Sequence, residues 1–165
     1  MTPPTVIVLM GVCGSGKSTV GQALARRIGA EFAEGDRWHP PENIAKMSKG
    51  MPLDDADRRP WLNALAGAID GWIADGRLTV LTCSALRQSY RDILIDGRSG
   101  VSLVYLRGDQ EMIAARLAKR RDHFMPASLL PSQFAQLEEP VGVPVVDIAP
   151  PPETVAEAIR QRLGL

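Results

Sequence analysis

Five short apolar runs recur along the chain, and amphipathic stretches lie between them. The runs cover residues 6–10, 78–83, 101–106 and 143–148, with a shorter candidate at 31–34. Residues 19–28 place Val20, Leu24 and Ile28 on one stripe, which is the spacing of an amphipathic helix. This alternation predicts βαβ units and an α/β fold, in which a parallel sheet is covered by helices on both faces.

The longest predicted helix begins after the acidic residues 54–57 and ends at Gly76. Pro60 is compatible with its first turn, and a glycine commonly ends a helix. Trp61 and Trp72 fall on its apolar side, and we interpret them as core residues rather than as a ligand platform. Further helices are predicted over 88–96, 109–119, 128–137 and 152–163.

The composition fits one globular domain spanning residues 1–165, with 45% hydrophobic residues. The formal net charge is zero and no block of like charge occurs, so we expect neither nucleic acid nor a membrane as a partner. The start of the chain lacks a signal-peptide pattern, and no apolar run approaches membrane-spanning length, so we expect a cytoplasmic protein. The two cysteines, Cys13 and Cys83, are expected to be free thiols.

Residues 11–18 read Gly-Val-Cys-Gly-Ser-Gly-Lys-Ser and directly follow the first apolar run. This G-x-x-x-x-G-K-[ST] pattern forms a phosphate-binding loop, whose backbone N–H groups and following helix N-terminus surround phosphate oxygens. Lys17 is expected to reach the β- and γ-phosphates, and Ser18 to ligate Mg²⁺. The loop therefore predicts a nucleoside triphosphate ligand. The residues assigned to it are Gly11, Gly14, Ser15, Gly16, Lys17, Ser18 and Thr19.

Two carboxylates, Glu34 and Asp36, follow the second predicted strand and flank Gly35. Ligands of open parallel sheets bind beyond the carboxyl ends of the strands, so these residues should lie near the phosphate loop. One carboxylate could accept a proton from an attacking hydroxyl while the other supports Mg²⁺ through water. No acidic residue ends the strand over 78–82, so Glu34 or Asp36 must supply that support. A solvated turn is the alternative.

Four basic residues are candidates for an anionic acceptor. Arg58 and Arg59 lie in the first turn of the long helix, where the macrodipole disfavours cations. They either pair with neighbouring aspartates or capture an anionic substrate group. Arg87 and Arg91 are four residues apart and share a helix face, close to the Ser84 hydroxyl. Together these residues predict a pocket for a molecule with a carboxylate and several hydroxyls.

The stretch 116–123 is rich in basic residues and joins two predicted helices. A run of this kind is often a solvated face, but small kinases keep a lid at this place. We therefore predict a lid over approximately 120–137. A lid arginine such as Arg120 would supply positive charge to the transferring phosphoryl group, and Arg116 is assigned to the nucleotide.

Several stretches in one order closely resemble the gluconate kinases, small phosphate-loop kinases related to shikimate kinase. Besides the loop, they are Gly-Asp-Arg-Trp-His-Pro at 35–40, Asp-Arg-Arg-Pro-Trp-Leu at 57–62, Cys-Ser-Ala-Leu-Arg at 83–87 and Gln-Phe at 133–134. The resemblance implies a three-layer P-loop NTPase fold, like that of nucleoside monophosphate kinases, with a helical lid. It also implies ATP-dependent phosphorylation of D-gluconate at the 6-hydroxyl to give 6-phosphogluconate and ADP, with Mg²⁺, in a homodimer.

Residue by residue, the resemblance gives catalytic roles to Lys17, Asp36 and Arg120, and metal support to Ser18 and Glu34. It implies a larger set of acceptor-binding residues. They are Asp36, His39, Arg58, Ser84, Arg87, Arg91, His123 and Gln133.

Three other functions remain possible from the sequence. A shikimate kinase or another small sugar-acid kinase would share the loop, but Glu34-Gly35-Asp36 replaces the D-x-D pair expected of shikimate kinase. A nucleoside monophosphate kinase would need a recognition turn that the chain lacks after the third predicted strand. A regulatory module could keep the nucleotide site without catalysis, although Asp36 and Arg58 argue against this alternative.

Overall fold

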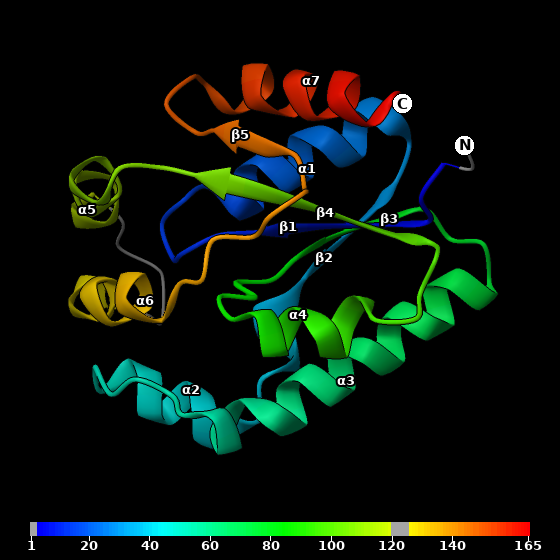
Figure 1. The fold of residues 1–165 in the computed structure, drawn as a ribbon. Helices are drawn as coiled ribbons and strands as arrows, with labels where there is room; N and C mark the ends of the chain where they lie inside the picture. Colours follow the sequence, from blue (N-terminus) through cyan, green and yellow to red (C-terminus); the bar gives the residue numbers. More distant parts are fainter. Residues whose placement is uncertain (1–2, 120–125) are drawn as a thin grey trace.

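A computed structural model describes residues 3–119 and 126–165 (Figure 1). Its centre is a five-stranded sheet in the order β2-β3-β1-β4-β5. All neighbouring strands pair in parallel, as the sequence predicts. The strands are β1 (Val6–Met10), β2 (Glu31–Glu34), β3 (Thr79–Thr82), β4 (Val101–Arg107) and β5 (Val145–Asp147).

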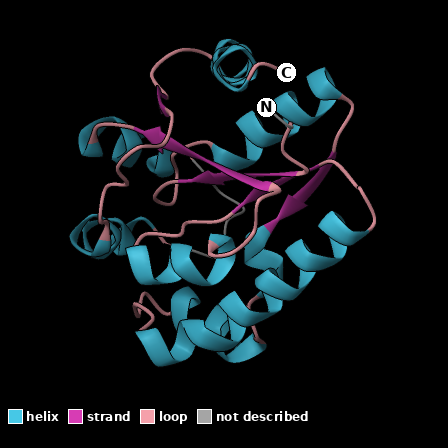
Figure 2. Cartoon of the chain, turned by 45° about the vertical axis from the view of Figure 1, so that its right-hand side comes forward, coloured by secondary structure: helices cyan, strands magenta, loops and turns pink. Residues whose placement is uncertain are grey.

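Helices cover both faces of this sheet, so the molecule has three layers (Figures 1 and 2). On one face α1 and α7 contribute Leu24 and Ile159 to a core with Ile7 and Leu9 of β1. On the other face α3 and α4 pack against Val8 of the same strand. The helices are α1 (Lys17–Ile28), α2 (Pro41–Ser48), α3 (Asp55–Ala74), α4 (Gln88–Ile95), α5 (Gln110–Ala118), α6 (Leu130–Gln136) and α7 (Pro152–Leu163), with two short 3₁₀ helices, η1 (Gly35–Trp38) and η2 (Ala127–Leu129).

The start of α3 is fixed by a reciprocal cap. The Asp54 side chain accepts a hydrogen bond from the Asp57 backbone N–H at 2.7 Å, and Asp57 accepts one from the Asp54 N–H at 3.0 Å. This arrangement satisfies two N–H groups that a helix otherwise leaves unpaired. It fixes the direction in which the first turns present Arg58 and Trp61.

Three elements differ from the sequence prediction. The helix α2 was not predicted, because Pro40 and Pro41 suggest a turn, whereas Pro41 in fact occupies the first helical position. The predicted helix over 128–137 is divided into η2 and α6, with Pro131 in the first turn of α6. The last strand is shorter than the apolar run 143–148, since only Val145–Asp147 extend beside β4.

Within the described ranges, no helix is both long enough and apolar enough to cross a membrane. Both cysteines are buried free thiols, as expected. Burial raises the pKa of the Cys83 thiol to about 12. That thiol is therefore protonated at neutral pH.

Candidate active site

The phosphate-binding loop joins β1 to α1 at the carboxyl edge of the sheet. Its glycines are required by close contacts: a Cβ at Gly14 would lie 2.6 Å from the Leu117 side chain, and one at Gly11 would lie 2.9 Å from the Leu106 carbonyl. Gly16 caps α1 in the left-handed conformation, at φ 88°. The backbone thus turns directly into the helix N-terminus, which favours anion binding there.

The two residues expected to handle the phosphates and the metal are held in place by neighbours. The Lys17 ammonium donates hydrogen bonds to the carbonyls of Gly11 (3.0 Å) and Val12 (2.9 Å). The Ser18 hydroxyl donates to the Glu34 carboxylate. Because β2 ends at Glu34, the strand itself brings this carboxylate to the start of α1.

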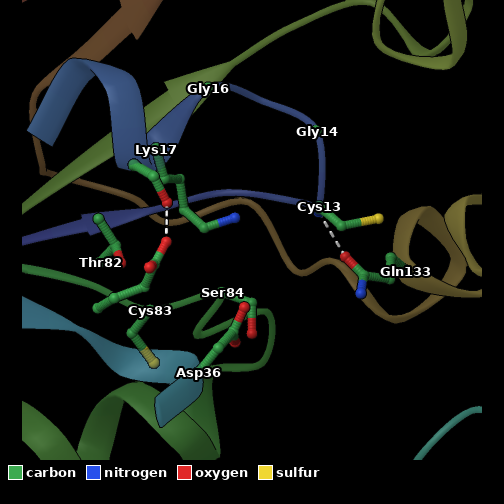
Figure 3. Close-up of a pocket in the computed structure, with 11 residues that line it drawn as sticks. Cys13, Gly14, Gly16, Lys17, Asp36, Thr82, Cys83, Ser84 and Gln133 are labelled. Carbon is green, nitrogen blue, oxygen red and sulfur yellow. Dashed lines mark hydrogen bonds between the residues drawn. The ribbon is translucent and has the colours of Figure 1, made fainter. Parts of the chain in front are cut away.

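One cavity brings the loop and the acceptor residues together (Figure 3). Lys17, Asp36 and Ser84 all line it, as the sequence predicts for strand-end residues. Gly35 makes this possible, because a Cβ there would lie 2.1 Å from the Thr82 carbonyl of β3. The remaining lining residues are Cys13, Gly14, Gly16, Ser18, Glu34, Thr82, Cys83 and Gln133.

A second cavity lies between the starts of α3 and α4, and its lining includes Arg58, Arg87, Tyr90 and Gln136 together with residues 52–56, among them Asp54 and Asp55. The Arg58 guanidinium donates to the Leu53 carbonyl at 2.7 Å and to the Tyr90 hydroxyl at 3.1 Å. Within the described residues it forms no ion pair with its aspartate neighbours, and Asp57 pairs with Lys46 instead, at 2.7 Å. Pairing with those neighbours therefore does not explain this buried arginine.

Arg87 and Arg91 have different surroundings. The Nε atoms of both arginines are buried and have no hydrogen-bond partner in the part of the chain that the structure describes, but only Arg87 lines the second cavity. Arg91 is 2% exposed and donates to the carbonyls of Ala85 (2.7 Å) and Glu138 (2.8 Å). Ala85 has a left-handed backbone, φ 44°, so Arg91 holds a strained turn next to Ser84.

A third cavity opens on the other side of the phosphate loop. It is lined by Gly16, Thr19 and Arg116 together with the segment 148–152. The Arg116 guanidinium donates to the Ile148 carbonyl at 2.7 Å, which holds it across this groove. Several predicted nucleotide residues thus line one groove, and residues 150–152 form one of its walls.

Comparisons with known proteins agree with this geometry. A family model described as an AAA domain matches residues 7–125. The chain is 44% identical over 154 residues to the thermoresistant gluconokinase of Escherichia coli K12, which covers 91% of this chain and 88% of that protein. It is 49% identical over 137 residues to the gluconokinase of Gluconobacter oxydans 621H, which covers 83% and 77% of the two chains. The chain belongs to the gluconokinase family.

Solved structures support the same assignment of the fold. A crystal structure of a gluconokinase from Sinorhizobium meliloti 1021 matches with a TM-score of 0.87 and 44% identity, covering 99% of this chain and 94% of that one. The shikimate kinase of Aquifex aeolicus matches with a TM-score of 0.66 but only 19% identity over 96% of each chain. The second likeness shows the P-loop kinase fold alone.

Some predicted site residues of this gluconokinase-family chain have unexpected positions. Gln133 accepts a hydrogen bond from the Cys13 backbone N–H at 2.7 Å, so α6 is tied directly to the phosphate loop (Figure 3). His39 lies on the Trp61 ring rather than in the lining of the cavity. Arg120 and His123 lie outside the described residues, so their assignments stay predictions.

Sequence reasoning missed two residues that contact predicted site residues. Asn43 is 4% exposed and bonds to His39, and Tyr90 links Arg58 to Asp55. Both are uncharged residues on helices, and their role depends on contacts between α2, α3 and α4. The only signal in the sequence was that Asn43-Ile44 and Tyr90-Arg91-Asp92 also resemble the gluconate kinases.

Proposed function

We propose that this chain is a gluconokinase that transfers the γ-phosphoryl group of ATP to the 6-hydroxyl of D-gluconate, giving 6-phosphogluconate and ADP. One observation carries the proposal. Lys17 of the phosphate loop and Asp36 line the same cavity in a chain that is 44% identical, over 91% of its length, to a named gluconokinase. Those are the two groups that a kinase needs on the donor and acceptor sides.

On the donor side, the chain's own residues fit ATP and Mg²⁺. The groove with Thr19 and Arg116 lies next to the phosphate loop and has the place that the nucleoside would take. The adjacent oxygens of Ser18 and Glu34 are the hard ligands that Mg²⁺ prefers, and Mg²⁺ usually uses only one or two protein groups besides phosphate and water. The ion would neutralise charge on the β- and γ-phosphates.

On the acceptor side, Asp36 accepts the proton of the attacking hydroxyl, and Ser84 offers a hydrogen bond from the same cavity. The cavity with Arg58 and Arg87 would take the other end of the acid, because two guanidinium groups there match a carboxylate. Arg91, predicted to contact the acceptor, donates to backbone carbonyls, and we infer that it holds the turn beside Ser84 instead.

The remaining parts of the proposal rest on the family resemblance. Arg120 would add positive charge at the transferring phosphoryl group, and His123 would contact the acceptor. The enzyme would work as a cytoplasmic homodimer, with a small-molecule substrate and no nucleic-acid or membrane partner. A zero formal net charge agrees with the last point.

Two substitutions test the proposal. Asp36→Asn should lower kcat far more than it raises KM for ATP, because an amide cannot take the proton. Lys17→Ala should abolish phosphoryl transfer even at saturating ATP and Mg²⁺, because it removes several kcal/mol of charge stabilisation. Steady-state kinetics with gluconate measure both. A pure KM effect for Asp36→Asn, or near-normal turnover of Lys17→Ala, would contradict the assigned roles.

A further inference from the structure

The residues around Asp36 form a rigid array that the proposed chemistry does not use directly. The His39 and Trp61 rings are stacked, with centroids 4.1 Å apart and planes at 16°. Trp61 also donates its indole N–H to the Gly35 carbonyl at 2.8 Å. The single residue Trp61 thus holds both ends of the short helix η1, which carries Asp36.

The hydrogen bonds of Asn43 define which ring nitrogen of His39 carries the proton. The Asn43 side-chain nitrogen lies 2.8 Å from the Asp57 carbonyl oxygen and 3.2 Å from His39 Nδ1. A carbonyl only accepts hydrogen bonds, so the Asn43 atom is the amide donor, and its second hydrogen points at Nδ1. Nδ1 must therefore be the acceptor, and the ring proton lies on Nε2.

That Nε2 faces the catalytic carboxylate. It lies 3.9 Å from Asp36 Oδ1, which is too long for a hydrogen bond but places the N–H dipole next to the oxygen. The His39 side chain is 3% exposed, and burial together with the charge of Arg58 lowers the pKa of His39 to about 4. A neutral N–H orients the carboxylate yet leaves it basic, whereas an imidazolium would weaken its basicity.

We propose that Asn43 is a positioning residue for phosphoryl transfer, because it locks His39 in the Nε2–H tautomer that faces Asp36. His39 is a positioning residue as well, because it acts on the Asp36 carboxylate and does not bind the acceptor directly. The inference rests on the proposed function only for its kinetic consequence. The tautomer itself is a property of the free protein.

The substitution Asn43→Asp tests this chain of contacts with little change of shape. An aspartate accepts hydrogen bonds, so His39 Nδ1 should become protonated and the Nε2–H tautomer is no longer enforced; the substitution also removes the donor to the Asp57 carbonyl. We expect kcat for gluconate to fall about 10- to 100-fold, as for other residues that orient a functional group, with KM for ATP changed less than twofold. Lys46→Met is the matched control: it removes another tie between α2 and α3, the 2.7 Å contact with Asp57. It should lower the melting temperature without lowering kcat.

A double substitution separates positioning from simple destabilisation. In a His39→Gln variant, residue 39 carries an amide N–H donor, and an amide has no tautomer for residue 43 to select. Adding Asn43→Asp should therefore cause less than a twofold further loss of kcat, whatever the rate of the single His39→Gln variant. An equal loss in both backgrounds, or a fall of kcat in Lys46→Met as large as in Asn43→Asp, would overturn the proposal.

The tautomer can be read directly in the full chain without substrates. The protein has two histidines, so ring ¹⁵N NMR spectra can be assigned with a His123→Asn variant. We expect a protonated Nε2 and an unprotonated Nδ1 for His39 at pH 7, and a protonated Nδ1 in Asn43→Asp. A protonated Nδ1 in the wild-type protein would overturn the inference. The expected spectra in a protein inactive toward gluconate would contradict the proposed function and leave the tautomer assignment standing.

Discussion

Arg87 and Arg91 are one helical turn apart, yet their guanidinium groups serve different parts of the molecule. Arg87 lines the second cavity, next to Arg58 and Tyr90. Arg91 is almost fully buried against two backbone carbonyls. The sequence could predict that the two share a face, but not which of them is already occupied, since the carbonyls come from distant positions.

This difference gives opposite expectations for the same substitution. Arg87→Lys should lower kcat/KM for gluconate about 10- to 150-fold, because losing a bidentate charged contact costs about 1.5 to 3 kcal/mol, and it should leave the melting temperature unchanged. Arg91→Lys should instead lower the free energy of unfolding by about 1.5 to 3 kcal/mol. Steady-state kinetics and urea unfolding of both variants test these roles. If Arg91→Lys impairs kinetics and Arg87→Lys impairs stability, Arg91 binds the acceptor and Arg87 has the structural role.

The buried His39 predicts how stability depends on pH. The unfolded chain binds a proton on this residue near pH 6.5, whereas its folded pKa is about 4. Stability should therefore fall as the pH is lowered from about 6.5 towards 4, by about 3 kcal/mol from this group alone. In His39→Gln that part of the slope should vanish, while carboxylate contributions remain in both proteins. If the free energy of unfolding depends on pH equally in the two proteins over this range, His39 is not shielded from solvent in the folded protein.

At the scale of elements, the sequence predicted strands and long helices well and short connections poorly. Apolar runs such as residues 6–10 stand out clearly from the polar residues around them, and they form β1 and the strands of the same sheet. The eight-residue α2 has two prolines at its start and few apolar residues, so its pattern resembles a turn. Its position depends on tertiary contacts, among them the bond from Asn43 to Asp57 on α3.

The contact between α6 and the phosphate loop also joins two distant elements. Gln133→Met keeps the side-chain length but removes the acceptor for the Cys13 N–H. We expect KM for ATP to rise about tenfold with KM for gluconate nearly constant, because the lost bond is worth about 1 to 1.5 kcal/mol and acts on the loop. Ser132→Ala on the same helix is the control, because its hydroxyl donates to the Leu129 carbonyl one turn earlier. A rise of KM confined to gluconate would return Gln133 to the acceptor-binding role predicted from the sequence.

At the scale of the whole molecule, one rule accounts for most of the site that could be predicted. Parallel strands place their carboxyl ends on one edge, so the loop after β1, the turn after β2 and the segment after β3 line a common cavity. The sequence could not show that Arg58 and Arg87 line a separate cavity. That cavity is formed where Tyr90 of α4 meets the capped start of α3.

The two cavities together give the central claim, that this chain phosphorylates a sugar acid with ATP. The most direct measurement is ADP release by the purified chain with gluconate, shikimate or AMP as the acceptor. We predict turnover with gluconate, and a kcat/KM at least about 100-fold above that for shikimate or AMP, because the site is built around a carboxylate and flexible hydroxyls. Equal or faster turnover with shikimate or AMP, or ADP release that no acceptor stimulates, would contradict the account.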